Sequence, residues 1–233
     1  MNKAYFRELF ATIVLVIAVW SPAYGADNAA PLGLVWGSSV DEVRALGIDL
    51  IAVPAKDFGD SYVAQKLPKA LSDQDNTALS FGFDNKLWRV VAISRLFEND
   101  PQGASVKARY QELLASLTEK YGKPRSVHSL GDSIFAQPAY FIAGLRSGKS
   151  FWYSELIGAD VKVQVAIRAE SNDGARWFIY YENKALSLSF QESKRLKEKG
   201  ALYCAQTALH GQVRAIEQNA HPSKQAPQSG TRA

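Results

Sequence analysis

The chain has 233 residues and a net charge of +4 at pH 7, with 47% hydrophobic and 21% charged residues. These fractions are typical of folded proteins and exclude a wholly disordered chain. The single cysteine excludes a disulfide framework and a cysteine-rich zinc module. The positive charge is too small and too dispersed to indicate a nucleic-acid partner.

The N-terminus has the three parts of a secretory signal. Lys3 and Arg7 give a positive start, and residues 9–20 form an almost unbroken apolar run of twelve residues. Ala23 and Gly25 then supply the small residues that a signal peptidase recognises. Because a bilayer core needs ~20 apolar residues, the run is short for a permanent span, and a retained anchor is the alternative. We predict cleavage after Gly25 and a periplasmic or secreted protein without a permanent membrane span.

An oxidising compartment would allow the lone cysteine to form a disulfide with a second chain. Cys204 is either buried or free to join a second chain. We favour burial because free cysteine is among the most buried residue types. A dimer linked through Cys204 is the alternative.

The first predicted element of the mature chain is a short helix capped by Ser39. Ser39 and Glu42 fit a capping box, in which each side chain bonds the other residue's backbone N–H. Gly47 supplies the stop. The following residues 54–76 are rich in turn formers, and we interpret them as a long loop with one helical turn.

A hairpin and a long helix are predicted next. Strands over residues 77–83 and 87–97 flank a tight turn. Both faces of the second strand carry apolar residues, so we expect it to be central. Asp100 and Pro101 favour a helix start, and an apolar stripe at steps of three and four residues continues to Gly122.

The second half of the chain is predicted to end in a meander and a helix. Residues 125–150 contain several turn signals and no clear element. Strands over residues 151–157, 161–168 and 176–182 follow, and their short links favour antiparallel pairing. A charged helix is predicted over residues 192–209.

This element order predicts an α+β fold, with an antiparallel sheet of about five strands and helices packed on one face. Phe97-Glu98-Asn99 and Tyr181-Glu182-Asn183 each end a predicted strand, so a tandem ββα duplication is an open alternative. The predicted organisation is a signal peptide over residues 1–25, a single α+β domain over 26–209 and a disordered tail over 210–233.

The sequence assembles no catalytic, cofactor or metal site. Gly148-Lys149-Ser150 has the end of a phosphate-binding loop but neither its spacing nor its following helix. The histidines are dispersed, so we expect no metal site and no cofactor. His128 with Asp132 and a nearby serine contains the residue types of a hydrolase. A hydrolase-type enzyme with a site in the 125–150 loop is therefore an alternative.

Aromatic residues on neighbouring predicted strands are the most distinctive feature. Flat rings beside polar groups can stack on sugars, peptides or lipid headgroups. Packing inside the sheet is the competing interpretation, because aromatic residues have a high strand propensity. We assign no catalytic residue, and the candidate binding residues are Trp152, Tyr153, Arg168, Arg176, Trp177 and Tyr180.

Three motifs resemble those of a family of uncharacterised exported proteobacterial proteins. They are WGSSVDEVR at residues 36–44, LSFGFDNKLWR at 79–89 and KYGKP at 120–124. The resemblance covers residues 34–202 and implies export and an α+β fold, with no catalytic residues to carry over. In element order alone, the chain is also similar to envelope modules of the β-lactamase-inhibitor-protein type, which bind proteins. It lacks the cysteines for the two disulfides expected of the inhibitor itself.

These observations predict a non-enzymatic binding or protein-interaction module of the cell envelope. Its expected partner is another envelope protein or a small ligand, and no nucleic acid. Besides the hydrolase, an inhibitor of a secreted enzyme that presents the 54–76 loop is an alternative.

Overall fold

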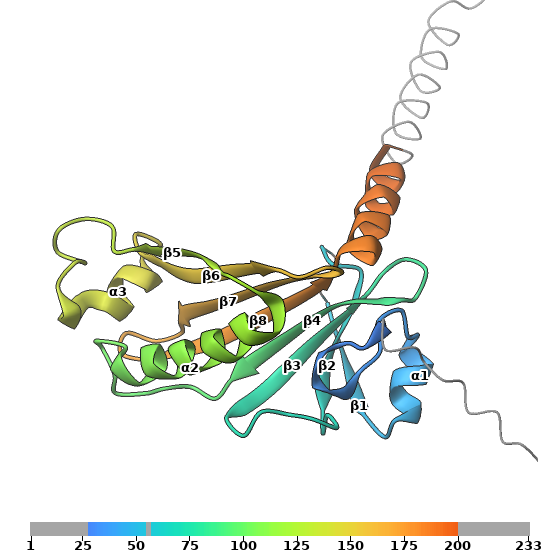
Figure 1. The fold of residues 1–233 in the computed structure, drawn as a ribbon, viewed down its shortest axis with the longest axis horizontal. Helices are drawn as coiled ribbons and strands as arrows, with labels where there is room; N and C mark the ends of the chain where they lie inside the picture. The colour runs from blue at the N-terminus through green and yellow to red at the C-terminus, as the bar shows by residue number, and fades with distance from the viewer. Residues whose placement is uncertain (1–27, 55–56, 200–233) are drawn as a thin grey trace, which may run out of the picture.

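The computed structural model describes residues 28–54 and 57–199. Eight strands form one antiparallel sheet in the order β1-β2-β3-β4-β8-β7-β6-β5 (Figure 1). The strands are β1 (Asp49–Val53), β2 (Asp60–Gln65), β3 (Gln74–Phe81), β4 (Leu87–Ser94), β5 (Arg125–Ser129), β6 (Phe151–Ile157), β7 (Val161–Ala169) and β8 (Ala175–Asn183). The helices are α1 (Val40–Ala45), α2 (Ala104–Tyr121), α3 (Phe141–Arg146), the short 3-10 turns η2 (Pro31–Gly33) and η3 (Pro138–Tyr140), and a helix over residues 184–199.

The prediction of about five strands is wrong, because β1, β2 and β5 escaped recognition. β1 and β5 lie at the two edges of the sheet, and most of their side chains are exposed. An edge strand buries little, so its sequence lacks the apolar alternation that marks a central strand. The predicted long loop over residues 54–76 is also wrong, since β2 lies within it.

The order of elements repeats across the two halves of the chain. In each half a helix comes before a four-stranded meander, with α1 before β1 to β4 and α2 before β5 to β8. The last strands of the meanders, β4 and β8, pair at the centre of the sheet. The predicted ββα unit is therefore wrong. Phe97 follows β4 outside the strand, whereas Tyr181 lies inside β8, so the two motifs are not equivalent.

Several local predictions are confirmed. The Ser39 hydroxyl accepts the Glu42 N–H at 3.2 Å, and the Glu42 carboxylate accepts the Ser39 N–H at 2.7 Å, which is the capping box of α1. The 151–182 meander and the central position of β4 are also as predicted. Helix α2 starts slightly later than expected, and Asp100 accepts the N–H groups of Ala104 and Ser105.

Helices α1 and α2 cover the same face of the sheet, which we call the covered face. The apolar stripe of α2 packs against β6, β7 and β8. Buried residues of α1 belong to the same core cluster. The core residues that strands contribute to this face include Leu79, Val90, Leu156, Val165 and Ile179.

The opposite side of the sheet, with Arg89, Tyr153, Gln164, Arg168 and Tyr180, is called the open face. The prediction that the helices pack on one face is wrong for the helix over residues 184–199. This helix continues from β8 and extends away from the sheet (Figure 1). Its Phe190 packs on Trp88, and neither residue belongs to the main core cluster.

The predicted signal peptide, Cys204 and the predicted C-terminal tail lie outside the described residues, as does the end of the predicted 192–209 helix. In the part of the chain that the structure describes, no helix has the length and apolar character needed to cross a membrane.

Candidate functional site

Strand β8 shows how the sheet separates two kinds of surface. Trp177 and Ile179 face the helices and are 0% and 1% exposed. Phe178 and Tyr180 alternate with them and are only partly buried. Successive side chains of a strand point to opposite faces, so these rings lie on the open face.

Two arginines interleave with the rings of the open face. The guanidinium carbon of Arg168 lies 5.7 Å from the ring centroid of Phe178 and 5.3 Å from that of Tyr180. The guanidinium carbon of Arg89 lies 5.3 Å from the Tyr180 centroid and 4.0 Å from that of Phe58. All four distances fall within the ~6 Å range of cation–π attraction.

A β-bulge extends this arrangement toward the C-terminal helix. Trp88 is an extra, unpaired residue of β4, because Arg89 pairs with Ser80 and Leu87 with Phe81. A bulge re-aims its side chain, and Trp88 lies with Arg89 against the Phe58 ring. The Trp88 ring also stacks on Phe190 at a centroid distance of 4.8 Å. We call the connected set the cation–aromatic array: Phe178, Arg168, Tyr180, Arg89, Phe58, Trp88 and Phe190.

The two arginines of the array differ in how their charge is balanced. Arg89 Nε donates to Glu182 Oε1 at 3.0 Å. Burial lowers the pKa of Arg89, against the attraction of Glu182. Arg168 is exposed, and among the described residues it has ring contacts but no hydrogen bond or ion pair. Burial also raises the pKa of Tyr180, although both arginines oppose the rise.

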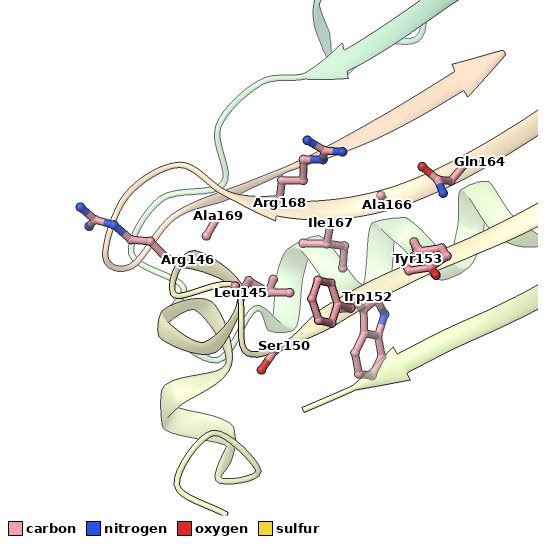
Figure 2. Close-up of a pocket in the computed structure, with 12 residues that line it drawn as sticks. Leu145, Arg146, Ser150, Trp152, Tyr153, Gln164, Ala166, Ile167, Arg168 and Ala169 are labelled. Carbon is pink, nitrogen blue, oxygen red and sulfur yellow. The ribbon is translucent and has the colours of Figure 1, made fainter. Parts of the chain in front are cut away.

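A groove lies beside the array where two strands diverge. The β6–β7 pairing ends at Tyr153 and Ala166, so Phe151 and Trp152 do not pair with β7. A cavity of about 450 Å³ opens between the strands, and Leu145 of α3 lies at its wall. Figure 2 shows side chains of β6, β7 and α3 around this groove.

A second, smaller hollow adjoins the groove on the open face. It has a volume of about 110 Å³. Gln164 and Arg168 line both spaces, so the groove and the hollow are neighbours along β7. The residues that line the hollow are Arg89, Lys162, Gln164, Arg168, Tyr180 and Glu182.

The structure divides the six residues chosen from the sequence between the two faces. On the open face lie Tyr153, Arg168, Arg176 and Tyr180, and on the covered face lie Trp152 and Trp177. The indole Nε1 of the buried Trp177 donates to Asp73 Oδ2 at 2.9 Å, at the edge of the core. Arg176 is held in ion pairs with Asp75 and Glu170.

The candidate set from the sequence lacks five members of the array: Phe178, Arg89, Phe58, Trp88 and Phe190. Phe178 and Arg89 share the parity of Tyr180 once the β4–β8 register is known, so alternation could have found them. Phe58 lies outside any strand, and only its position in space brings it to Arg89. No pattern in the sequence marks it.

The surroundings of His128 bear on the hydrolase alternative. The ring stacks on Trp152 at a centroid distance of 4.0 Å, and its Nε2 lies 3.2 Å from the Tyr110 hydroxyl. Tyr110 in turn lies 2.6 Å from Ser154 Oγ. Burial lowers the pKa of His128. These contacts join β5 and β6 to α2, and Asp132 makes no hydrogen bond with His128 in the described part of the chain.

Within residues 28–54 and 57–199, no group of three or more His, Cys, Asp or Glu side chains could hold a metal ion.

No protein-family model, curated protein or solved structure matches the chain.

Proposed function

We propose that this protein is a non-enzymatic binding module of the cell envelope, which holds its partner on the open face of the sheet. The cation–aromatic array is the observation that carries the proposal. Aromatic and arginine side chains dominate the binding energy of protein interfaces, because they offer large rigid areas and several hydrogen-bond donors. An array of both on an uncovered face supports a binding role.

The composition of the open face also supports this proposal. A solvated sheet face normally carries polar residues opposite its apolar ones. Here Phe151 and Ile157 of β6, on the same face of the sheet as the half-buried rings of β8, are 53% and 69% exposed. Apolar area that water contacts costs free energy, and a partner that covers it recovers that free energy.

The N-terminal sequence supports the location that we propose. The positive start, the apolar run and the small residues before Ala26 have the order of a cleaved leader. Mass spectrometry of the exported protein is expected to find a chain that begins at Ala26. Recovery of the full-length chain from the cytosol would contradict the proposal.

The function is tested by capture from envelope extracts with the immobilised mature chain. We expect one identified partner to be retained by the wild type and lost with Phe178→Ala. Tyr140→Ala is the matched control, because Tyr140 is 42% exposed on η3 and lies outside the array. Thermal unfolding of each variant checks that it is folded. Equal recovery by all three proteins, or no specific partner, would contradict the proposal.

A further inference from the structure

We infer that the open face recognises a carboxylate of an acidic, extended segment of a partner polypeptide, in the hollow beside Arg168 and Tyr180. This inference rests on the proposed function, because it names the chemistry that the same surface would bind. Three features carry it: the charge balance of the hollow, its size, and the open backbone of the adjoining groove.

The charge balance of the hollow favours a single negative charge. Arg89 is paired with Glu182 at 3.0 Å, and Lys162 Nζ lies 3.4 Å from Glu155 Oε1. Arg168 has no carboxylate partner among the described residues, so one positive charge is left over. A monoanion balances that charge, whereas a dianion would leave excess negative charge next to Glu182.

The size and the donors of the hollow fit a carboxylate. Its volume of about 110 Å³ is enough for the few water molecules that a carboxylate group would displace. A guanidinium presents paired N–H donors that match the two oxygens of a carboxylate. The rings of Phe178 and Tyr180 hold the Arg168 guanidinium in place. The Tyr180 hydroxyl, which bonds no other described residue, is a further donor at the same site.

The adjoining groove favours a polypeptide as the source of this carboxylate. Beyond Ala166, β7 pairs with β8 on one side only, because the β6 ladder has ended. Backbone groups of a strand alternate in direction, so some N–H and C=O groups of Ile167 to Ala169 point toward the groove. An extended segment can bond such groups, as in strand addition. Phe151 and Tyr153 offer apolar contacts to its neighbouring side chains.

The probe is an acetylated, amidated pentapeptide with one glutamate flanked by two leucines, added to the mature chain and followed by NMR amide shifts. We expect saturable shifts at residues 164, 168 and 180, with a dissociation constant of about 1 mM or below. A peptide with glutamine in place of glutamate should bind about tenfold more weakly. Absence of binding, or equal binding of both peptides, would overturn the inference.

Two further probes identify the source and the charge of the ligand. We expect 3-phenylpropionate, a free carboxylate with an apolar tail, to bind more weakly than the glutamate peptide, because it cannot bond the strand backbone. Equal or tighter binding would overturn the polypeptide source. We expect a phosphoserine peptide to bind no better than the glutamate peptide, and clearly tighter binding would overturn the preference for a monoanion.

Two charge-reversal variants test whether binding of the glutamate peptide depends on this site. We expect Arg168→Glu to weaken the glutamate peptide about tenfold or more, and Lys123→Glu to leave its affinity unchanged. Lys123 is exposed beyond α2 and provides the same change in net charge. Unchanged affinity with Arg168→Glu would overturn the inference. If Phe178→Ala loses the envelope partner while Arg168→Glu keeps it, the face binds without a carboxylate, and only the present inference fails.

Discussion

The two faces of the sheet satisfy their polar groups in different ways. On the covered face, the Trp177 indole bonds Asp73, and Asp73 also accepts two hydrogen bonds of 2.9 Å from the Arg109 guanidinium. On the open face Arg89 and Arg176 are also held in ion pairs, but Arg168 and the hydroxyl of Tyr180 form no hydrogen bond or ion pair with another described residue. Most buried polar groups are paired within the fold, with the indole Nε1 atoms of Trp36 and Trp152 as exceptions among the described residues, whereas exposed polar groups can be completed by a partner. The contrast therefore separates residues that hold the fold together from residues that are available for binding.

The largest effect on stability is expected from replacing Asp73, which accepts hydrogen bonds from both Trp177 and Arg109 on the covered face. Asp73 and Arg109 side chains are only 13% and 27% exposed, so Asp73→Asn leaves a largely buried guanidinium with the exposed Glu112 as its one remaining carboxylate partner among the described residues. We expect a loss of about 3 kcal/mol in the free energy of unfolding, measured by urea denaturation. A loss below about 0.5 kcal/mol, the range of ordinary surface changes, would show that Asp73 does not join α2 to β8 through Arg109 and Trp177.

The pKa of the Asp73 carboxylate also allows a prediction of how stability depends on pH. Burial alone would raise the pKa of Asp73, but the hydrogen bonds from Arg109 and Trp177 outweigh it and hold the pKa below its ordinary value. This stabilisation is present above the unfolded pKa of about 3.9 and is lost as the pH falls toward the folded value. We expect Asp73→Asn to remove that part of the acid dependence. Identical pH profiles of the two proteins would contradict it.

Neighbouring residues of β8 provide a matched test of the two faces. Ile179 is 1% exposed in the core, so we expect Ile179→Ala to cost about 3 kcal/mol through a cavity. Phe178→Ala on the open face should cost less, about 1 kcal/mol, because its ring is partly solvated already. Equal losses in denaturation would show that the open face is packed like the core.

The smallest effect on stability is expected at Arg168. Its side chain is exposed and forms no ion pair in the described part of the chain, so Arg168→Ala should change the unfolding free energy by less than about 0.5 kcal/mol. Thermal unfolding at matched ionic strength measures it. A large loss would mean that the guanidinium is required by the fold itself.

Much of the fold follows from local patterns that physical chemistry makes visible in the sequence. The stripe of α2 and the alternation of β7 and β8 were predictable because each element buries one side. The capping box at Ser39 is fixed by two residues and needs no tertiary information. Edge strands β1 and β5 were not predictable, since pairing on one side leaves their side chains in water.

The candidate site was only partly predictable for a related reason. Trp177 and Tyr180 differ in parity along β8, so one strand cannot present both on the same face. Which parity faces the helices depends on where α2 packs, and that is a tertiary fact. The contacts of Arg89 with Phe58 and of Trp88 with Phe190 join segments far apart in the chain, so they required the structure.

Hydroxyl-radical footprinting of the protein with its captured partner tests the use of the open face most directly, because it reports side-chain exposure ring by ring. We predict that Phe178 and Tyr180 become protected when the partner is bound, while Tyr140 keeps its reactivity. Unchanged reactivity of Phe178 and Tyr180 together with protection of Tyr140 would contradict the account.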